Sequence, residues 1–432
     1  MTSIAFTSLF LGLVLGTNTV GAIVEGPVAA VEFQLDGRRI ARVEKAPWSS
    51  RVDLGRDLAP RELVARALDR SGEEVARARQ WLNLPRRSAE AEIVLETDAN
   101  GQAVAARLAW QSLLGSRPER VSVTFDGRSL PVDETRRVKL PAYDSQASHL
   151  LTAELEFPSG VRSRTDVVVG GASSGNATSE LTAVPIRIVG KKLPNVADLQ
   201  DRFVKDSKPL RAAAVEYGPA QVLIVRDRGR GEAATVLGTS DLAAAERLRY
   251  EMRVRRGDRI RFVWPVPIRH VDAQISSDLF DSSRDFVRED GGLHWLMTRV
   301  YHPDGSLPQQ RFTDAVATAG LQAFASGRRR AVVLVLGARA DDASTLSPEA
   351  VRSYLDKLRV PLHVWTLVEP ASRPEIARWG DVEEVNSLWR LQRAFDRLED
   401  DLDSQRVVWI EGKHLPQEIA LSEKAAGIEI AR

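Results

Sequence analysis

Three short polar stretches hold residue types from which an ion site could be built. Val222–Gly231 (VLIVRDRGRG) runs from four apolar residues into a loop of arginines and glycines with one aspartate. Asp281–Asp285 (DSSRD) places three oxygen-bearing side chains at alternate positions, and Asp341-Asp342 are adjacent acids. Oxygen ligands suit Mg²⁺, whereas glycines and arginines suit anions. Residue type alone therefore permits a cation site or an anion site.

Other catalytic chemistries lack the residues that they need. The chain has 6 His and no Cys. It has no H-x-x-x-H pattern and no P-loop ending. Lys+Arg 60 against Asp+Glu 59 leaves a formal net charge of +1, so charge implies neither nucleic acid nor an anionic membrane as a partner. We predict that the protein is not an enzyme.

The N-terminus predicts export. Ile4–Gly16 (IAFTSLFLGLVLG) is an apolar run too short for a membrane span, and Val20-Gly21-Ala22 offers small residues for cleavage. We predict a signal peptide at residues 1–22 and a secreted or periplasmic location. The same run also allows an uncleaved anchor. No later segment predicts a membrane span.

Two copies of a small β-domain are predicted next. Val31–Ile40 (VEFQLDGRRI) and Val121–Leu130 (VSVTFDGRSL) both alternate apolar and polar residues into Asp-Gly, a strong hairpin signal. Leu63–Gly72 and Leu151–Gly160 repeat a second alternating pattern at nearly the same separation. We predict domains at 23–85 and 88–170. They resemble the immunoglobulin-like sandwiches that serve as spacers in bacterial surface proteins.

Strands and helices alternate in the second half of the chain. A Gly/Ser linker at 171–180 and a short β lead-in unit at 181–218 precede this region. Arg330–Leu336 is apolar enough for a strand covered on both faces, and Phe312–Ala325 predicts a helix before it. Ser347-Pro348 predicts the start of the next helix. This pattern predicts an α/β domain at 219–370 and a C-terminal helix and strand at 371–432.

Thr313–Leu367 (TDAVATAGLQAFASGRRRAVVLVLGARADDASTLSPEAVRSYLDKLRVPLHVWTL) resembles von Willebrand factor type A domains. With the lead-in unit, the match resembles the subgroup found in secreted proteins of acidobacteria and related bacteria. The resemblance implies a doubly wound, Rossmann-like α/β sheet. The expected fold class is therefore multidomain, with two all-β immunoglobulin-like sandwiches followed by this α/β domain.

The resemblance also implies a metal-ion-dependent adhesion site, which this sequence does not preserve. Asp227 matches the first aspartate of the family pattern. The positions of the other ligands hold Gly229, Gly231, Gln310 and Gly337–Ala338. Neighbouring arginines oppose a dication. We predict no metal and no cofactor at this edge of the sheet.

The expected function is protein binding or scaffolding at the bacterial cell envelope, with an unknown envelope or extracellular protein as partner. The predicted contact edge consists of Asp227, Arg228, Arg230, Gln310, Arg311, Arg339 and Asp341. One alternative is a metal-dependent adhesin with non-standard ligands such as Asp281 and Asp285. A capped loop is the favoured interpretation of that stretch. A hydrolase that uses the Asp and Glu residues of the crevice is a further alternative, and it has no motif to support it.

Overall fold

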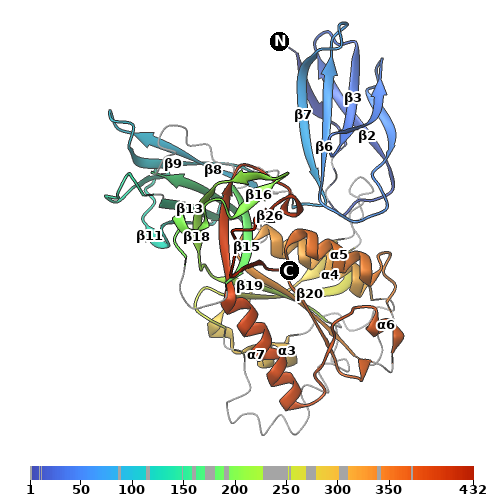
Figure 1. The fold of residues 1–432 in the computed structure, drawn as a ribbon, viewed down its shortest axis with the longest axis vertical. Coiled ribbons are helices and arrows are strands. Elements are labelled where there is room, and N and C mark those ends of the chain that lie inside the picture. Colours follow the sequence, from blue (N-terminus) through green and yellow to red (C-terminus); the bar gives the residue numbers. More distant parts are fainter. Residues whose placement is uncertain are drawn as a thin grey trace.

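The computed structural model describes residues 2–8, 10, 12–85, 89–112, 117–147, 149–157, 162–170, 181–188, 194–226, 252, 254–268, 279–300, 310–337, 342–370 and 373–432. These residues form seven sheets. Figure 1 shows one β unit at the upper right, a second at the left, a third in the centre, and a sheet with helices below.

The first β unit is a sandwich of two antiparallel sheets, with strand orders β1-β2-β5 and β4-β3-β6-β7. Val20, Phe33 and Leu63 are fully buried between the sheets, as inward-facing residues of a sandwich should be. The strands are β1 (Ser3–Phe6), β2 (Thr17–Glu25), β3 (Ala30–Leu35), β4 (Arg38–Val43), β5 (Ser49–Asp53), β6 (Arg61–Leu68) and β7 (Glu74–Leu82).

This sandwich begins before residue 23, where the predicted domain starts. β1 pairs with β2 from Ser3 opposite Glu25 to Phe6 opposite Ala22, and Thr17–Gly21 pairs with β5. Residues 1–22, the predicted signal peptide, thus supply one strand and part of another in this structure. Ile4, Phe6, Phe10 and Val14 of that stretch pack against the sandwich core. The same apolar pattern therefore fits both a leader segment and half-buried strands.

The second β unit is also a sandwich, with strand orders β11-β10-β13-β14 and β12-β9-β8. The predicted hairpins are confirmed in both sandwiches. Asp36-Gly37 and Asp126-Gly127 join β3 to β4 and β10 to β11, with φ of 49° and 76° in one turn and 47° and 78° in the other. Two consecutive positive φ values match the twist of a tight hairpin. The strands are β8 (Ala89–Thr97), β9 (Ala103–Ser112), β10 (Arg120–Phe125), β11 (Arg128–Leu130), β12 (Arg137–Lys139), β13 (His149–Glu156) and β14 (Arg162–Val169).

The third β unit joins two segments that are far apart in the sequence. β18, β25, β15 and β27 form an antiparallel sheet in that order, beside a small sheet β17-β16-β26. Ile186, Phe203 and Ile410 are fully buried in their common core. The residues predicted as a C-terminal extension therefore complete the lead-in unit. The strands are β15 (Leu181–Ile188), β16 (Phe203–Lys205), β17 (Lys208–Leu210), β18 (Ala212–Glu216), β25 (Gln405–Glu411), β26 (Ala420–Leu421) and β27 (Ile428–Ile430), with the 3-10 helices η3 (Ala197–Leu199) and η7 (Pro416–Glu418).

A six-stranded sheet holds the remaining strands in the order β21-β20-β19-β22-β23-β24. Its pairs are parallel except for β20 with β21. The strands are β19 (Ala220–Val225), β20 (Arg259–Ile268), β21 (Leu279–Ser282), β22 (Arg329–Leu336), β23 (Leu362–Thr366) and β24 (Glu383–Glu384). The helices are η5 (Arg288–Asp290), α3 (Leu293–Arg299), α4 (Phe312–Ala325), α5 (Pro348–Leu358), α6 (Pro374–Ala377) and α7 (Leu388–Ser404). None of these helices is both long and apolar enough to cross a membrane.

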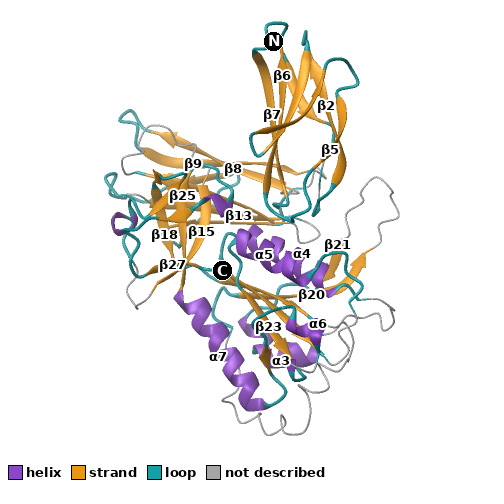
Figure 2. Cartoon of the chain, turned by 45° about the vertical axis from the view of Figure 1, so that its right-hand side comes forward, coloured by secondary structure: helices purple, strands orange, loops and turns teal. Residues whose placement is uncertain are grey.

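Helices cover both faces of this sheet (Figure 2). α4 and α5 pack on one face, against Val332, Leu334 and Leu336 of β22. α3 and α7 pack on the other, against Val333 and Val335. Every residue of β22 is buried, which explains its nearly continuous apolar run. The predicted strand at Arg330–Leu336 and the helix at Phe312–Ala325 are confirmed.

Arg328 and the first two residues of β22, Arg329 and Arg330, make contacts between distant parts of the chain. Arg328 donates two hydrogen bonds to Glu154 of the second sandwich, at 2.6 and 2.9 Å. Arg329 donates to the Leu402 carbonyl of α7 at 2.6 Å and lies 3.5 Å from Asp258. Each long side chain therefore reaches a segment that is distant in the sequence.

Arg330 is fully buried without a carboxylate partner among the described residues. It donates to the carbonyls of Phe324 and Arg359 at 3.3 and 3.2 Å, at the C-terminal ends of α4 and α5. Burial lowers the pKa of Arg330 to about 9. The partial negative charge at helix C-termini compensates part of the cost of burying this cation.

The first sandwich is fixed to α5 by a buried polar contact. The Tyr354 hydroxyl donates to the Asn83 carbonyl at 2.8 Å. The Asn83 side chain donates in turn to the carbonyls of Val14 and Ala59, at 2.9 and 2.8 Å. Leu58 of the sandwich belongs to the same hydrophobic cluster as α4 and α5. The sandwich and the helical layer therefore share a packed junction.

The predicted fold class is wrong and must be corrected to mostly β. Strand accounts for 45% and helix for 18% of the structure, so sheets dominate. The last helix, α7, does not close an α/β domain. It leads into β25, and this strand pairs with β15 and β18 of the third β unit. The sequence also predicts a helix at 242–255, before β20, and most of that range lies outside the described residues. Apolar patterns show that a segment is buried but not which sheet it joins, which is why the prediction failed.

Candidate contact site at the end of β22

The structure describes two of the seven predicted contact residues. Gln310 and Arg311 lie directly before α4, beside the end of β22. The other five lie outside the described residues: Asp227, Arg228, Arg230, Arg339 and Asp341. The described geometry therefore concerns the part of the predicted edge next to α4 and the loop that follows residue 341.

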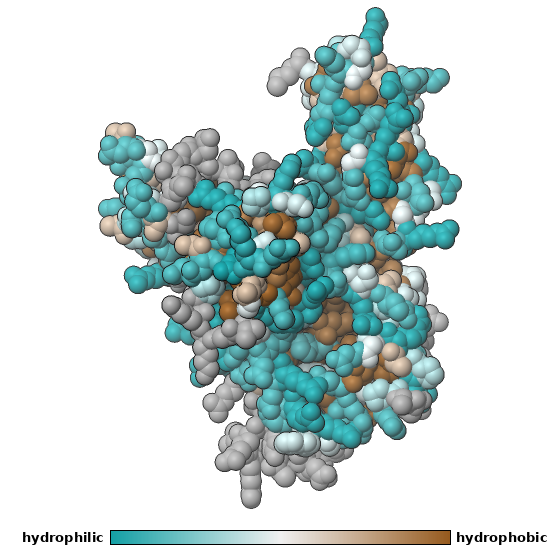
Figure 3. Space-filling model, viewed as in Figure 1, coloured by the Kyte–Doolittle hydropathy of each residue, from teal (hydrophilic) through white to brown (hydrophobic). Residues whose placement is uncertain are grey.

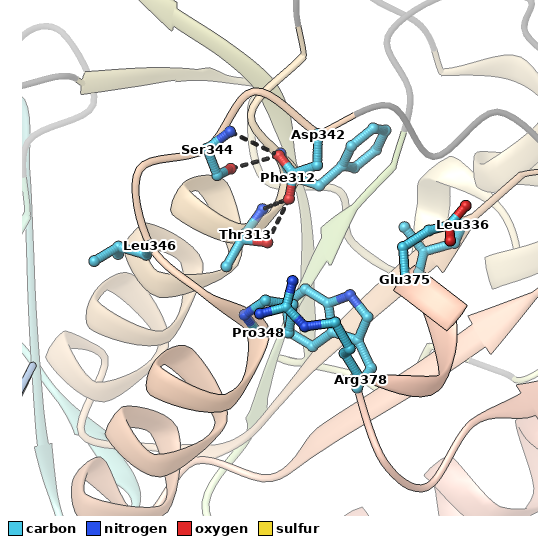
Figure 4. Close-up of a pocket in the computed structure, with 10 residues that line it drawn as sticks. Phe312, Thr313, Leu336, Asp342, Ser344, Leu346, Pro348, Glu375 and Arg378 are labelled. Carbon is cyan, nitrogen blue, oxygen red and sulfur yellow. Dashed lines mark hydrogen bonds between the residues drawn. The ribbon is translucent and has the colours of Figure 1, made fainter. Parts of the chain in front are cut away.

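A hollow of about 210 Å³ lies at this place. Figure 4 shows its residues coming from the start of α4, the end of β22, the loop before α5, and α6. Its lining is mixed, with apolar and charged side chains: Phe312, Thr313, Leu336, Asp342, Ser344, Leu346, Pro348, Glu375, Arg378 and Trp379. The carboxyl ends of parallel strands are a common place for binding sites.

Asp342 builds one wall of the hollow by capping α4 from another segment. Its carboxylate accepts hydrogen bonds from the backbone N–H groups of Phe312 and Thr313 at 2.9 and 3.1 Å, and from the Thr313 hydroxyl. The residue at the N-cap position, Arg311, makes no side-chain cap. Asp342 therefore satisfies free N–H groups where the helix dipole favours negative charge.

Asp314 of α4 in turn accepts hydrogen bonds from the loop before α5. Its carboxylate accepts from the backbone N–H groups of Thr345 and Leu346, both at 3.0 Å, and from the Arg311 Nε at 2.7 Å. Arg311 also lies 5.8 Å from the ring centroid of Phe280. The side chain of Arg311 is 17% exposed and helps to hold the loop through Asp314. The partner contact predicted for Arg311 stays a prediction.

The backbone of Gln310 also helps to hold this loop. Its carbonyl accepts a hydrogen bond from the Ala343 N–H at 2.9 Å. Together with the bonds of Asp342 and Asp314, this contact holds the loop against the start of α4. The shape of the hollow is thus set by contacts within the fold.

The outer rim of the hollow carries an exposed ion pair. Arg378 donates to Glu349 of α5 at 2.8 and 2.9 Å. The hydrogen bond from Arg378 lowers the pKa of Glu349 to about 2. Glu375 is exposed beside this pair, whereas Trp379 is buried beneath it. The site therefore combines an apolar floor with charges of both signs on its rim.

The residues of the alternative metal site have structural partners. Asp285 pairs with Arg261 at 2.7 Å. The Ser283 hydroxyl accepts from the Phe262 N–H at 3.0 Å, and Asp281 accepts from the Ser282 N–H at 2.8 Å. Among the described residues, no three His, Asp or Glu side chains gather as metal ligands would. Asp281 thus lies in β21, and Ser283 and Asp285 hold the loop that follows this strand.

The sequence interpretation missed most of the residues that line the hollow. Asp342 was considered only as part of an acidic pair, although an acid that follows a strand can cap a nearby helix. Arg378 and Trp379 gave no signal at all, because only the folding of α6 brings them to the end of β22. Pro374-Glu375 is a helix-start pattern that could have marked the neighbouring helix.

Comparison with known proteins does not place the chain in a family. No protein-family model and no curated protein matches its sequence. Among solved structures, fibronectin(III)-like modules of Clostridium thermocellum CbhA align at 14% identity and a TM-score of 0.16, over 39% of this chain and 93% of theirs.

Two other solved structures give similarly weak matches. The central fibronectin-III array of RIM-binding protein aligns at 10% identity and a TM-score of 0.21, over 45% of this chain and 81% of that one. A beta-glycosidase from Bacteroides vulgatus aligns at 11% identity and a TM-score of 0.22, over 39% of this chain and 24% of that one. The two sandwiches are therefore defined by their own strand pairing alone.

Proposed function

We propose that this protein is a non-enzymatic scaffold of the bacterial cell envelope that binds a partner protein at the hollow beside β22. The size of the hollow is the main support. At about 210 Å³ it is smaller than typical small-molecule sites, which span about 300–1,000 Å³. A single side chain of a partner is a better match for this volume than a substrate.

The composition of the site also favours a protein contact. Its apolar floor would receive the body of a partner side chain, while Glu375, Arg378 and Asp342 would orient polar groups around it. Buried aromatic anchors surrounded by a polar rim are the usual arrangement in protein interfaces. The loop that shapes the site is held by the bonds of Asp342 and Asp314 before any partner arrives, which reduces the entropy cost of binding.

The surrounding surface is consistent with a solvated protein that exposes only local contact sites. Hydrophilic side chains cover most of the face in Figure 3, and hydrophobic side chains gather near the centre, where the units meet. On this face the exposed apolar side chains thus lie mainly near the junctions between units. A small mixed hollow is then a better candidate for partner recognition than a broad apolar patch.

Site-specific crosslinking tests this proposal. A photo-reactive amino acid replaces Glu375 at the rim, and a matched protein carries it at Arg70 in an exposed turn of the first sandwich. Crosslinking is carried out with a bacterial envelope fraction, and the captured protein is then purified and its affinity measured. We expect a product specific to position 375 and at least tenfold weaker binding after Arg378→Glu, but not after Arg70→Glu. Equal amounts of crosslinked product at both positions, or an affinity that Arg378→Glu leaves unchanged, would refute the proposal.

A further inference from the structure

A second hollow, of about 480 Å³, lies on the opposite face of the six-stranded sheet. Its walls are the segment before β20, the turn from η5 to α3, and one residue of α7. The lining residues are Val254, Arg255, Arg256, Arg288, Gly291, Gly292 and Glu399. This volume falls in the range of about 300–1,000 Å³ typical of small-molecule sites.

The three arginines of this hollow differ in whether a described carboxylate pairs with them. Arg255 is engaged, because it donates to the Tyr217 hydroxyl at 2.8 Å and to Glu399 at 3.3 Å, and it also pairs with Asp403. Glu399 is thus neutralised by its neighbour. Arg256 and Arg288 are exposed, and neither pairs with a carboxylate in the described part of the chain. Two positive charges therefore face the hollow without a described counter-charge.

The turn beside these arginines is built from glycine so that an aromatic ring can approach. Gly291 has a φ of 114°, and a Cβ there would lie 3.0 Å from the Cδ1 of Trp295. Any other residue would therefore be strained and would press on that ring. Trp295 is 49% exposed, and the Arg299 guanidinium lies 4.6 Å from its centroid. An exposed aromatic ring thus packs against Gly291, which lines the hollow.

We propose that this hollow binds a small organic phosphate monoester, independently of the contact site beside β22. A phosphate monoester carries a charge of about −1.5 to −2 at pH 7, which matches Arg256 and Arg288 together. One carboxylate would neutralise only one of them. Guanidinium groups donate paired hydrogen bonds to phosphate oxygens. Trp295 is placed to contact the organic part.

Calorimetric titration of the full chain tests this proposal, with inorganic phosphate, phenyl phosphate and acetate as probes. We expect saturable one-to-one binding of both phosphates, tighter for phenyl phosphate, and no saturable binding of acetate. The double variant Arg256→Gln, Arg288→Gln should weaken both phosphates by about tenfold or more, since each loses a charged hydrogen-bond donor. Trp295→Ala should remove the advantage of phenyl phosphate and leave inorganic phosphate unchanged.

The matched control is Arg70→Gln, Arg128→Gln, which removes two exposed arginines, one from a turn of the first sandwich and one from the start of β11 in the second. This control should bind both phosphates as the parent protein does. The proposal is overturned if neither phosphate saturates, if acetate binds equally, or if both double variants lose affinity to the same extent. It is also overturned if Trp295→Ala retains the preference for phenyl phosphate. None of these results bears on crosslinking at Glu375, so the two proposals can fail separately.

Discussion

The ion pair between Glu154 and Arg328 should contribute measurably to holding the second sandwich on the six-stranded sheet. The two side chains are 29% and 7% exposed and share two short hydrogen bonds. Unit charges about 4 Å apart attract by about 4 kcal/mol at an effective dielectric constant of about 20. Desolvation offsets part of this energy, so we expect a coupling energy of about 2 kcal/mol.

A double-mutant cycle with Glu154→Gln and Arg328→Met, read out by urea unfolding, measures this coupling energy. The matched control is the cycle for Glu349 and Arg378. Their hydrogen bonds are nearly as short, at 2.8 and 2.9 Å, but their side chains are about half exposed, at 54% and 52%. We expect a much smaller coupling in the control, because solvent screens exposed pairs. Equal coupling energies in the two cycles would show that burial does not determine the strength of these ion pairs.

The pH dependence of the first cycle provides a second check. Burial raises the pKa of Glu154. The charge and hydrogen bonds of Arg328 and the charges of Arg164 and Arg259 lower this pKa by more, so it lies below its ordinary value of 4.5. A carboxylate with a depressed pKa stabilises the fold fully above its unfolded pKa and loses that effect as the pH falls through the folded value. The coupling should therefore be constant near pH 7 and decline below pH about 4.5. A coupling that increases on acidification would contradict the assigned pair.

Three other substitutions test separate parts of the structure. Tyr354→Phe should cost about 1–2 kcal/mol in the free energy of unfolding, because it leaves the buried Asn83 carbonyl without its donor; chemical denaturation measures this, and a neutral effect would mean that the junction is open. Asp342→Ala should cost about 1 kcal/mol by removing the cap of α4, and hydrogen exchange should increase first at Phe312 and Thr313; unchanged exchange there would rule out the cap. Val20→Ala should cost about 2–3 kcal/mol in thermal unfolding, whereas Ile23→Ala, at a side chain that is 57% exposed, should be nearly neutral; equal losses would argue against the position of β2.

The elements that follow from local signals were predicted well from the sequence. The Asp-Gly hairpins need positive φ at adjacent positions, and few sequences supply that. α5 begins at Pro348 with Ser347 as its cap, accepting from the Ala350 N–H at 3.2 Å, as the Ser-Pro pattern predicts. Such signals depend on a few neighbouring residues, so they survive whatever the rest of the chain does.

Long-range pairing could not be predicted in the same way. β25 reads as a short apolar strand after a helix, which suits the last strand of an α/β sheet and an antiparallel edge equally well. Its pairing with β15 and β18 depends on segments about 200 residues earlier in the chain. The hollow beside β22 has the same origin, because α6 and the Asp342 loop meet only in the folded chain.

The arginines at the start of β22 show that an arginine beside an apolar strand need not face solvent. The side chain of Arg311 and those of Arg328–Arg330 are largely buried in the fold. There they meet carboxylates or the carbonyl ends of helices. A buried guanidinium is tolerated only where such acceptors are already placed, so an arginine within a buried strand indicates a junction between units. By the same reasoning, Arg256 and Arg288 stand out because they line a hollow and no described carboxylate pairs with them, which is why we assign the anion site to them.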